Sequence, residues 1–141
     1  MTRSSPQQNV SPRLQHLTPI LIVDAVEPCL AFWVTRLGFV AENQVPGADG
    51  RLVFASVKNG DIEVMYQTRD SVLAERPEAA LELSGHSTAL FITTEDLDAA
   101  ERAVQGAPVV KARHTTFYGS VEIYVKEPGG NTVGFAQFTS V

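Results

Sequence analysis

The chain has 141 residues, about the length of one domain, and an ordinary composition with 44% apolar and 19% charged residues. Its formal net charge of -5, without clustered lysine or arginine, argues against nucleic acid as a partner. No apolar run approaches the roughly 20 residues of a membrane-spanning helix and the N-terminus does not read as a secretion signal, so we expect a cytoplasmic protein with no membrane partner.

The first half of the chain predicts a strand, a helix and three more strands. Residues 1–13 are polar, contain two prolines and are expected to form a flexible tail. A short buried strand is predicted at residues 20–23. Further strands are predicted at residues 39–44, 51–57 and 62–67, because glycine-containing turn sequences separate three strand-like runs.

The first helix is predicted between Asp24, as its N-cap, and Gly38, which ends it. Cys29 lies within it and is expected to be a packed side chain, since a single cysteine cannot form an internal disulfide. Core packing is favoured over a dimer contact for Trp33. The apolar face at helical spacing consists of Leu30, Trp33, Val34 and Leu37.

The second half repeats this order after a partly helical connector at residues 68–86. An apolar run at 88–92 is followed by a helix capped by Thr94, a strand at 109–112 and a hairpin. The segment 61–66 aligns with 132–137, which indicates an internal repeat. We therefore predict one domain at 14–141, with modules at 14–67 and 87–141.

The last hairpin, residues 120–138, turns at the sequence EPGG, where proline and two glycines favour a turn. Before the turn, Val121, Ile123 and Val125 alternate with polar residues. Alternation alone leaves open whether the polar face looks into a cleft or out to water. That face carries Glu122, Tyr124 and Lys126.

The ordered set of short motifs resembles the vicinal oxygen chelate superfamily, which contains glyoxalases, bleomycin resistance proteins and extradiol dioxygenases. The motifs are AFW at 31–33, LGF at 37–39, TFYG at 116–119 and EPGGN at 127–131. The resemblance covers about residues 16–138. It implies an α+β fold in which two βαβββ modules form an open, mixed β-barrel-like cleft with the helices outside. It also implies a homodimer, and leaves open whether the modules pair within one chain or swap across the dimer.

Enzymes of this family usually hold a divalent metal with side chains from the first and last strands of each module. The resemblance places these positions near Thr18 and Ala89, and on Glu63 and Gly134. Only Glu63 is a strong ligand, and one carboxylate is too few for a catalytic site. We therefore expect no metal and no other cofactor.

Three histidines offer an alternative, in which Glu63 and displaced histidines hold a divalent metal for a lyase, isomerase or dioxygenase. They are His16, His86 and His114. Strand slippage would be needed to bring His16 into a ligand position, so a structural or solvent-exposed role is favoured.

The favoured function is binding of a small molecule in the cleft, as in sequestration of a drug or metabolite, and whether any reaction is catalysed stays open. Glu63 and Met65 are expected on the cleft face, where the carboxylate could pair with a cation or act as a base. Gly134 and Ala136 on the other module are expected to leave an opening. The expected ligand-binding residues are Glu63, Met65, Phe117, Tyr118 and Glu122.

Overall fold

The computed structural model describes residues 12–13, 15–80, 83 and 88–139. Most of the expected N-terminal tail and His86 lie outside these residues. Within them, no helix is long and apolar enough to cross a membrane.

The first module has the expected order of one strand, a helix and three strands. In its sheet β4 is central between β1 and β3, β1 runs parallel to β4, and the strand order is β1-β4-β3-β2. The predicted strand at residues 20–23 is confirmed. The elements are β1 (Ile20–Val23), α1 (Glu27–Ala31), the π-helical segment η3 (Phe32–Arg36), β2 (Val40–Pro46), β3 (Leu52–Asn59) and β4 (Ile62–Thr68).

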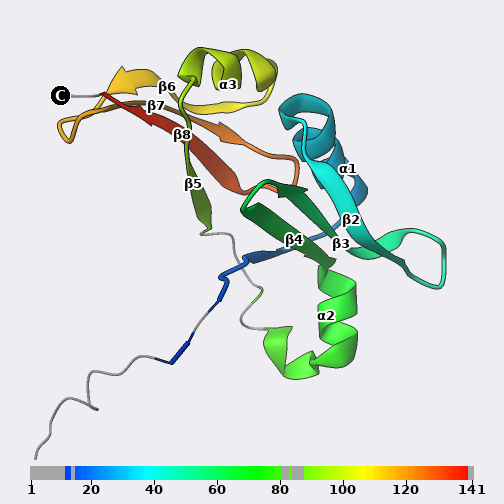
Figure 1. The fold of residues 1–141 in the computed structure, drawn as a ribbon. Helices are drawn as coiled ribbons and strands as arrows, with labels where there is room; N and C mark the ends of the chain where they lie inside the picture. Colours follow the sequence, from blue (N-terminus) through cyan, green and yellow to red (C-terminus); the bar gives the residue numbers. More distant parts are fainter. Residues whose placement is uncertain (1–11, 14, 81–82, 84–87, 140–141) are drawn as a thin grey trace, which may run out of the picture.

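The second module repeats this topology, with the strand order β5-β8-β7-β6 and a parallel β5–β8 pair. The repeat predicted from the sequence is therefore confirmed. The two four-stranded sheets are not closed into a barrel (Figure 1). The connector contains α2 (Arg69–Glu75) and η4 (Pro77–Ala80), and the module contains β5 (Ala89–Thr93), α3 (Leu97–Ala103), β6 (Val109–Thr115), β7 (Ser120–Lys126) and β8 (Thr132–Phe138).

The first helix differs from its prediction at both the cap and the apolar face. Val26 occupies the N-cap position without a side-chain cap, whereas the Asp24 carboxylate accepts a hydrogen bond from Arg69 Nε at 3.2 Å. The π-helical segment widens the turn and shifts the later side chains around the axis. Trp33 is fully buried, but Val34 from the predicted apolar face is 37% exposed.

The helix of the second module, α3, has Asp96 as its N-cap. The prediction of Thr94 as the N-cap was wrong by two residues. The Asp96 carboxylate accepts from the backbone N–H of Ala99 at 3.0 Å, whereas Thr94 Oγ accepts from the N–H of Asp96 itself. Leu97 in α3 and Val104 at its C-cap are buried in the core cluster, so this face of the helix packs on the sheet.

A series of buried hydrogen bonds joins the two modules. Trp33 Nε1 donates to Tyr66 Oη at 2.8 Å, and the Tyr66 hydroxyl donates to the Glu127 carboxylate at 2.5 Å. Glu127 also accepts from the backbone N–H of Asn131 at 2.7 Å, which holds the β7–β8 turn. Burial, and then the charge of Glu127, raise the pKa values of Tyr66 and of the packed thiol of Cys29. The EPGGN motif therefore links the second module to the first.

Candidate functional site

The burial of residues along β7 shows on which side of the sheet its polar face lies. Ile123 and Val125 are buried in the core cluster that Leu97 of α3 shares. Because strand side chains alternate, Glu122 and Tyr124 lie on the opposite side of the sheet, away from α3. Glu122 nevertheless is only 1% exposed, so this polar face is covered by its own neighbours.

The Glu122 carboxylate is surrounded by hydroxyl groups. Ser120 Oγ and Tyr118 Oη both donate to Oε2 at 2.7 Å, and Tyr124 Oη donates to Oε1 at 2.8 Å. His114 on the neighbouring strand β6 places Nε2 4.0 Å from Oε1. The strand register brings Ser120 and Glu122 to one face, and the β6–β7 turn folds Tyr118 back over them.

These hydrogen bonds decide the charge of the carboxylate. Burial raises the pKa of Glu122, but the hydroxyl donors Ser120, Tyr118 and Tyr124 together with His114 outweigh it, so the pKa lies below the ordinary value of 4.5. Burial and the same carboxylate raise the pKa of Tyr124 to about 12. At neutral pH the cluster therefore holds an ionised carboxylate and protonated tyrosines.

Four exposed aromatic side chains form a continuous row beside this carboxylate. Ring centroids are separated by 6.4 Å between Phe91 and Phe138, by 6.3 Å between Phe138 and Tyr118, and by 5.1 Å between Tyr118 and Phe117. Phe117 is 100% exposed, so it does not anchor its loop to the core. We call Phe91, Phe138, Tyr118 and Phe117 the aromatic row.

The opening expected at Gly134 is filled. Tyr124 lies opposite Gly134 in the β7–β8 register, and its ring covers the glycine. A Cβ atom on Gly134 would lie 2.3 Å from Cε2 of that ring. Ala136 beside it is fully buried. The small residues therefore serve to seat the tyrosine ring and leave no empty space, which corrects the expectation.

Glu63 and Met65 lie on the first sheet. Both are half-buried, on the side of β4 opposite to the buried Val64 and Tyr66. In the strand register, Glu63 lies opposite Lys58 of β3, and Met65 lies opposite Ile20 of β1. Within one chain the structure thus brings Phe117, Tyr118 and Glu122 together, with Glu63 and Met65 on a separate sheet.

Sequence reasoning missed four members of this site or gave them no role in it. Phe91 and Phe138 were read only as parts of strands, and Tyr124 and Ser120 had no assigned role. The available signal was the strand register. Counting in twos along β5, β7 and β8 would have placed Phe91, Gly134 and Tyr124 on one face.

The positions that the family resemblance assigns to a metal do not form a ligand set. Thr18 and Ala89 are weak or apolar, and at Gly134 the space holds the Tyr124 ring. His16 is exposed, whereas His114 lies with Nε2 4.0 Å from the carboxylate of Glu122. Among the described residues, no three histidine, cysteine or acidic side chains gather closely enough to hold a metal ion.

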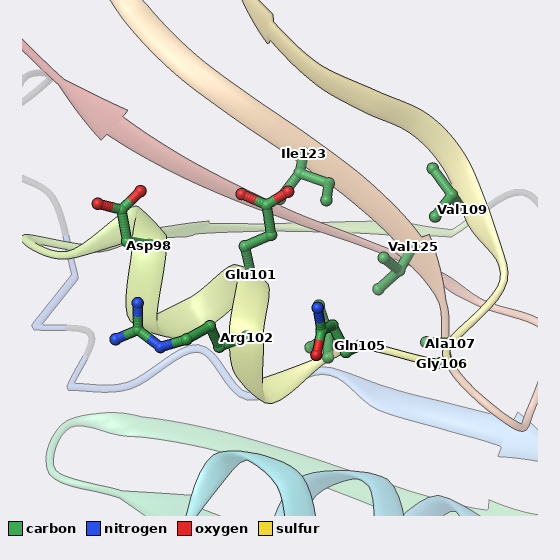
Figure 2. A pocket seen from close by; sticks show the side chains of 10 residues that line it. Asp98, Glu101, Arg102, Gln105, Gly106, Ala107, Val109, Ile123 and Val125 are labelled. Atoms are coloured by element: carbon green, nitrogen blue, oxygen red, sulfur yellow. The ribbon is translucent and has the colours of Figure 1, made fainter.

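A groove of about 320 Å³ lies elsewhere, between α3 and strands β6 and β7. Figure 2 shows Asp98, Glu101 and Arg102 on the helix side, with Val109 and Val125 on the strands. This groove is on the helix side of the second sheet. It contains none of the residues predicted to bind a ligand.

The sequence matches the family model of the Glyoxalase/Bleomycin resistance protein/Dioxygenase superfamily over residues 13–135. An uncharacterized protein of Mycobacterium tuberculosis (strain ATCC 25618 / H37Rv) is 29% identical over 126 residues, which cover 87% of this chain and 72% of that protein.

Solved structures show the same fold. A glyoxalase/bleomycin resistance protein/dioxygenase family enzyme from Burkholderia phytofirmans PsJN aligns with a TM-score of 0.71 at 16% identity, covering 86% of this chain and 97% of that one. TnmS3, an antibiotic binding protein from Streptomyces sp. CB03234, aligns with a TM-score of 0.68 at 21% identity, covering 92% and 100%. With the repeated module and the family match over most of its length, this chain belongs to the Glyoxalase/Bleomycin resistance protein/Dioxygenase superfamily.

Proposed function

We propose that this protein binds a small molecule on the sheet faces that carry the five predicted residues, without a metal, and so sequesters a drug or metabolite. The observation that carries the proposal is the exposed aromatic row beside a buried carboxylate. Aromatic walls with a few placed polar groups are typical of small-molecule sites. A relative of the same fold, TnmS3, is an antibiotic binding protein, which supports this class of function.

The exposure of the aromatic row favours a ligand over a purely structural role. Phe91, Tyr118 and Phe138 are each about half exposed, and Phe117 is fully exposed. Contiguous apolar surface of this kind commonly marks an interaction site. A flat aromatic compound lying on these rings would remove its own apolar surface and that of the rings from water.

The donor set at the family's metal positions does not fit a catalytic metal, because only Glu63 among those four side chains ligates strongly. We therefore propose a metal-free site and assign no step of a reaction. The alternative of a metal-dependent lyase, isomerase or dioxygenase requires further ligands on Glu63, and the described residues place Lys58 opposite it.

We further propose a homodimer in which β4 of one protomer meets the second sheet of its partner. Within one chain, Val64 and Phe135 from the two sheets belong to one core cluster. The opposite sides of both sheets are then available to a second chain, which would bring Glu63 and Met65 to the aromatic row. A cytoplasmic location stays a prediction from the sequence.

Elemental analysis combined with thermal unfolding tests the metal-free proposal. We expect no stoichiometric metal and no rise in melting temperature with nickel, cobalt, zinc, manganese or iron. A ligand that binds only the folded state raises the apparent stability, so hydrophobic compounds that bind should raise the melting temperature. A stoichiometric metal that is lost in Glu63→Ala would contradict the proposal.

A further inference from the structure

We propose that the face formed by the aromatic row and Glu122 selects planar aromatic compounds that carry a positive charge. This inference rests on the proposed binding function and adds the chemical class of the ligand. It follows from three features: the direction of the hydrogen bonds around Glu122, the neutral donors that hold its charge, and the position of the exposed rings.

The hydrogen bonds leave this face rich in acceptors. Tyr118 and Tyr124 each have one hydroxyl proton, and both donate it to Glu122. Their remaining lone pairs can only accept. His114 Nδ1 lies 2.8 Å from the carbonyl oxygen of Ala112, a contact that requires the proton on Nδ1. In the neutral ring Nε2 is then also an acceptor.

The hydrogen bonds to the carboxylate come from neutral hydroxyl groups. Its three donors are the neutral groups of Ser120, Tyr118 and Tyr124, and His114 Nε2 is 4.0 Å away. Two nearby basic side chains have partners elsewhere, whereas Lys111 lies opposite Tyr124 in the β6–β7 register. Arg113 bonds to Asp98 and Glu101, and Lys126 donates to the carbonyl of Gly130. A buried anion of this kind favours a cation placed just outside it.

The rings provide the surface on which such a cation would lie. Tyr118 belongs both to the aromatic row and to the shell of Glu122, so one ring contacts the apolar surface and the charge. His114 stacks on Tyr124 with an angle of 22° between the ring planes, which extends the aromatic surface. The negative faces of aromatic rings attract cations in addition to stacking with flat ligands.

An isosteric pair of probes separates charge from shape. 1-Methylquinolinium is a cation, and 1-methylnaphthalene has nearly the same shape and no charge. Titration followed by ligand-observed NMR on the full chain should give at least tenfold tighter binding of the cation, which corresponds to about 1.4 kcal/mol. Glu122→Gln should remove this preference, so that the variant binds both probes with the same affinity. Phe138→Ala should weaken both probes.

The outcomes distinguish the two levels of the proposal. Equal affinity of the wild-type protein for both probes, or a preference that survives in folded Glu122→Gln, would overturn the selection of cations and leave the binding face intact. If neither probe binds, or if Phe138→Ala and Phe91→Ala change nothing, the proposed binding function itself fails. The comparison of probes on the wild-type protein decides the question even if Glu122→Gln does not fold.

Discussion

Glu122 and Glu127 are both almost fully buried, and the molecule holds them in different surroundings. Glu127 lies where the two modules meet, and it accepts hydrogen bonds from the Tyr66 hydroxyl and from the backbone N–H of Asn131. Glu122 lies on the opposite side, among hydroxyl groups next to exposed rings. The first carboxylate therefore connects the modules, and the second is the one that we propose acts on a ligand.

Removing the Tyr66 hydroxyl should weaken the junction of the modules. Tyr66→Phe leaves Trp33 Nε1 without its acceptor and takes one donor from Glu127. The unsatisfied buried groups should lower the free energy of unfolding by about 2–3 kcal/mol, measured by urea denaturation. Tyr118→Phe is the matched control, because its hydroxyl also bonds to a glutamate but its side chain is exposed, and it should cost less than about 1 kcal/mol. Equal losses in the two variants would show that the junction contributes little.

Glu122 should make stability depend on acid pH. Because its pKa is lower in the folded state than the ordinary 4.5, its contribution is present above that value and is lost as the pH falls through the folded pKa. The titratable groups that face it are Tyr118, Tyr124 and His114.

Urea denaturation between pH 7 and pH 3 would measure this effect as the difference between the wild-type protein and Glu122→Gln. The difference should be largest at pH 7 and shrink below pH 4.5, where the wild-type carboxylate takes up a proton. Other acidic groups cancel in this comparison. A difference that stays constant over the whole range would refute a lowered pKa.

At the scale of elements, β7 and β8 pack one face on α3 and build the candidate site on the other. The turn at EPGG and the alternation of β7 were predictable, because each depends on local sequence. The burial of Glu122 was not, since it depends on Tyr118 folding back from the turn and on His114 of a neighbouring strand. Similarly, the cap at Asp96 and the π-helical shift around Trp33 reflect packing that short motifs do not encode.

The contact of Gly134 with Tyr124 can be tested by adding one methyl group. Gly134→Ala places Cβ against the ring and should displace Tyr124 from its hydrogen bond with Glu122. We expect a loss of about 1–3 kcal/mol in urea denaturation. In the Tyr124→Ala background the same substitution should cost almost nothing, because the ring is absent. If Gly134→Ala cost the same in both backgrounds, the Tyr124 ring would not require glycine at this position.

At the scale of the whole molecule, the sequence predicted two similar modules, and the structure has two sheets of the same topology. The grouping of site residues was harder to predict. Glu63 and Met65 belong to one sheet, and Phe117, Tyr118 and Glu122 belong to the other. In the proposed dimer, the sheet faces that carry these two groups meet across the interface between chains, which a single chain does not contain.

The proposed dimer predicts that two defective chains restore binding when mixed. The mass in solution should be twice the 15.3 kDa of one chain. One variant would carry Glu63→Ala and Met65→Ala, and the other would carry Tyr118→Ala and Phe138→Ala. If each site takes β4 from one protomer and the aromatic row from the other, a mixed dimer has one intact site. Each variant alone should bind weakly. Mixing equal amounts after partial unfolding should recover about a quarter of the wild-type capacity, because about half of the dimers are then mixed and each has one intact site of two. Sites formed within single chains would show no recovery.

The most direct test of the account is a map of where a ligand binds. A compound that raises the melting temperature would be titrated into ¹⁵N-labelled protein, and the amide chemical shifts followed by NMR. We predict that the shifts change most at Phe91, Tyr118, Glu122 and Phe138, on the side of the second sheet away from α3. Changes concentrated instead at Glu101 and Val109, in the helix-side groove of Figure 2, would contradict the account.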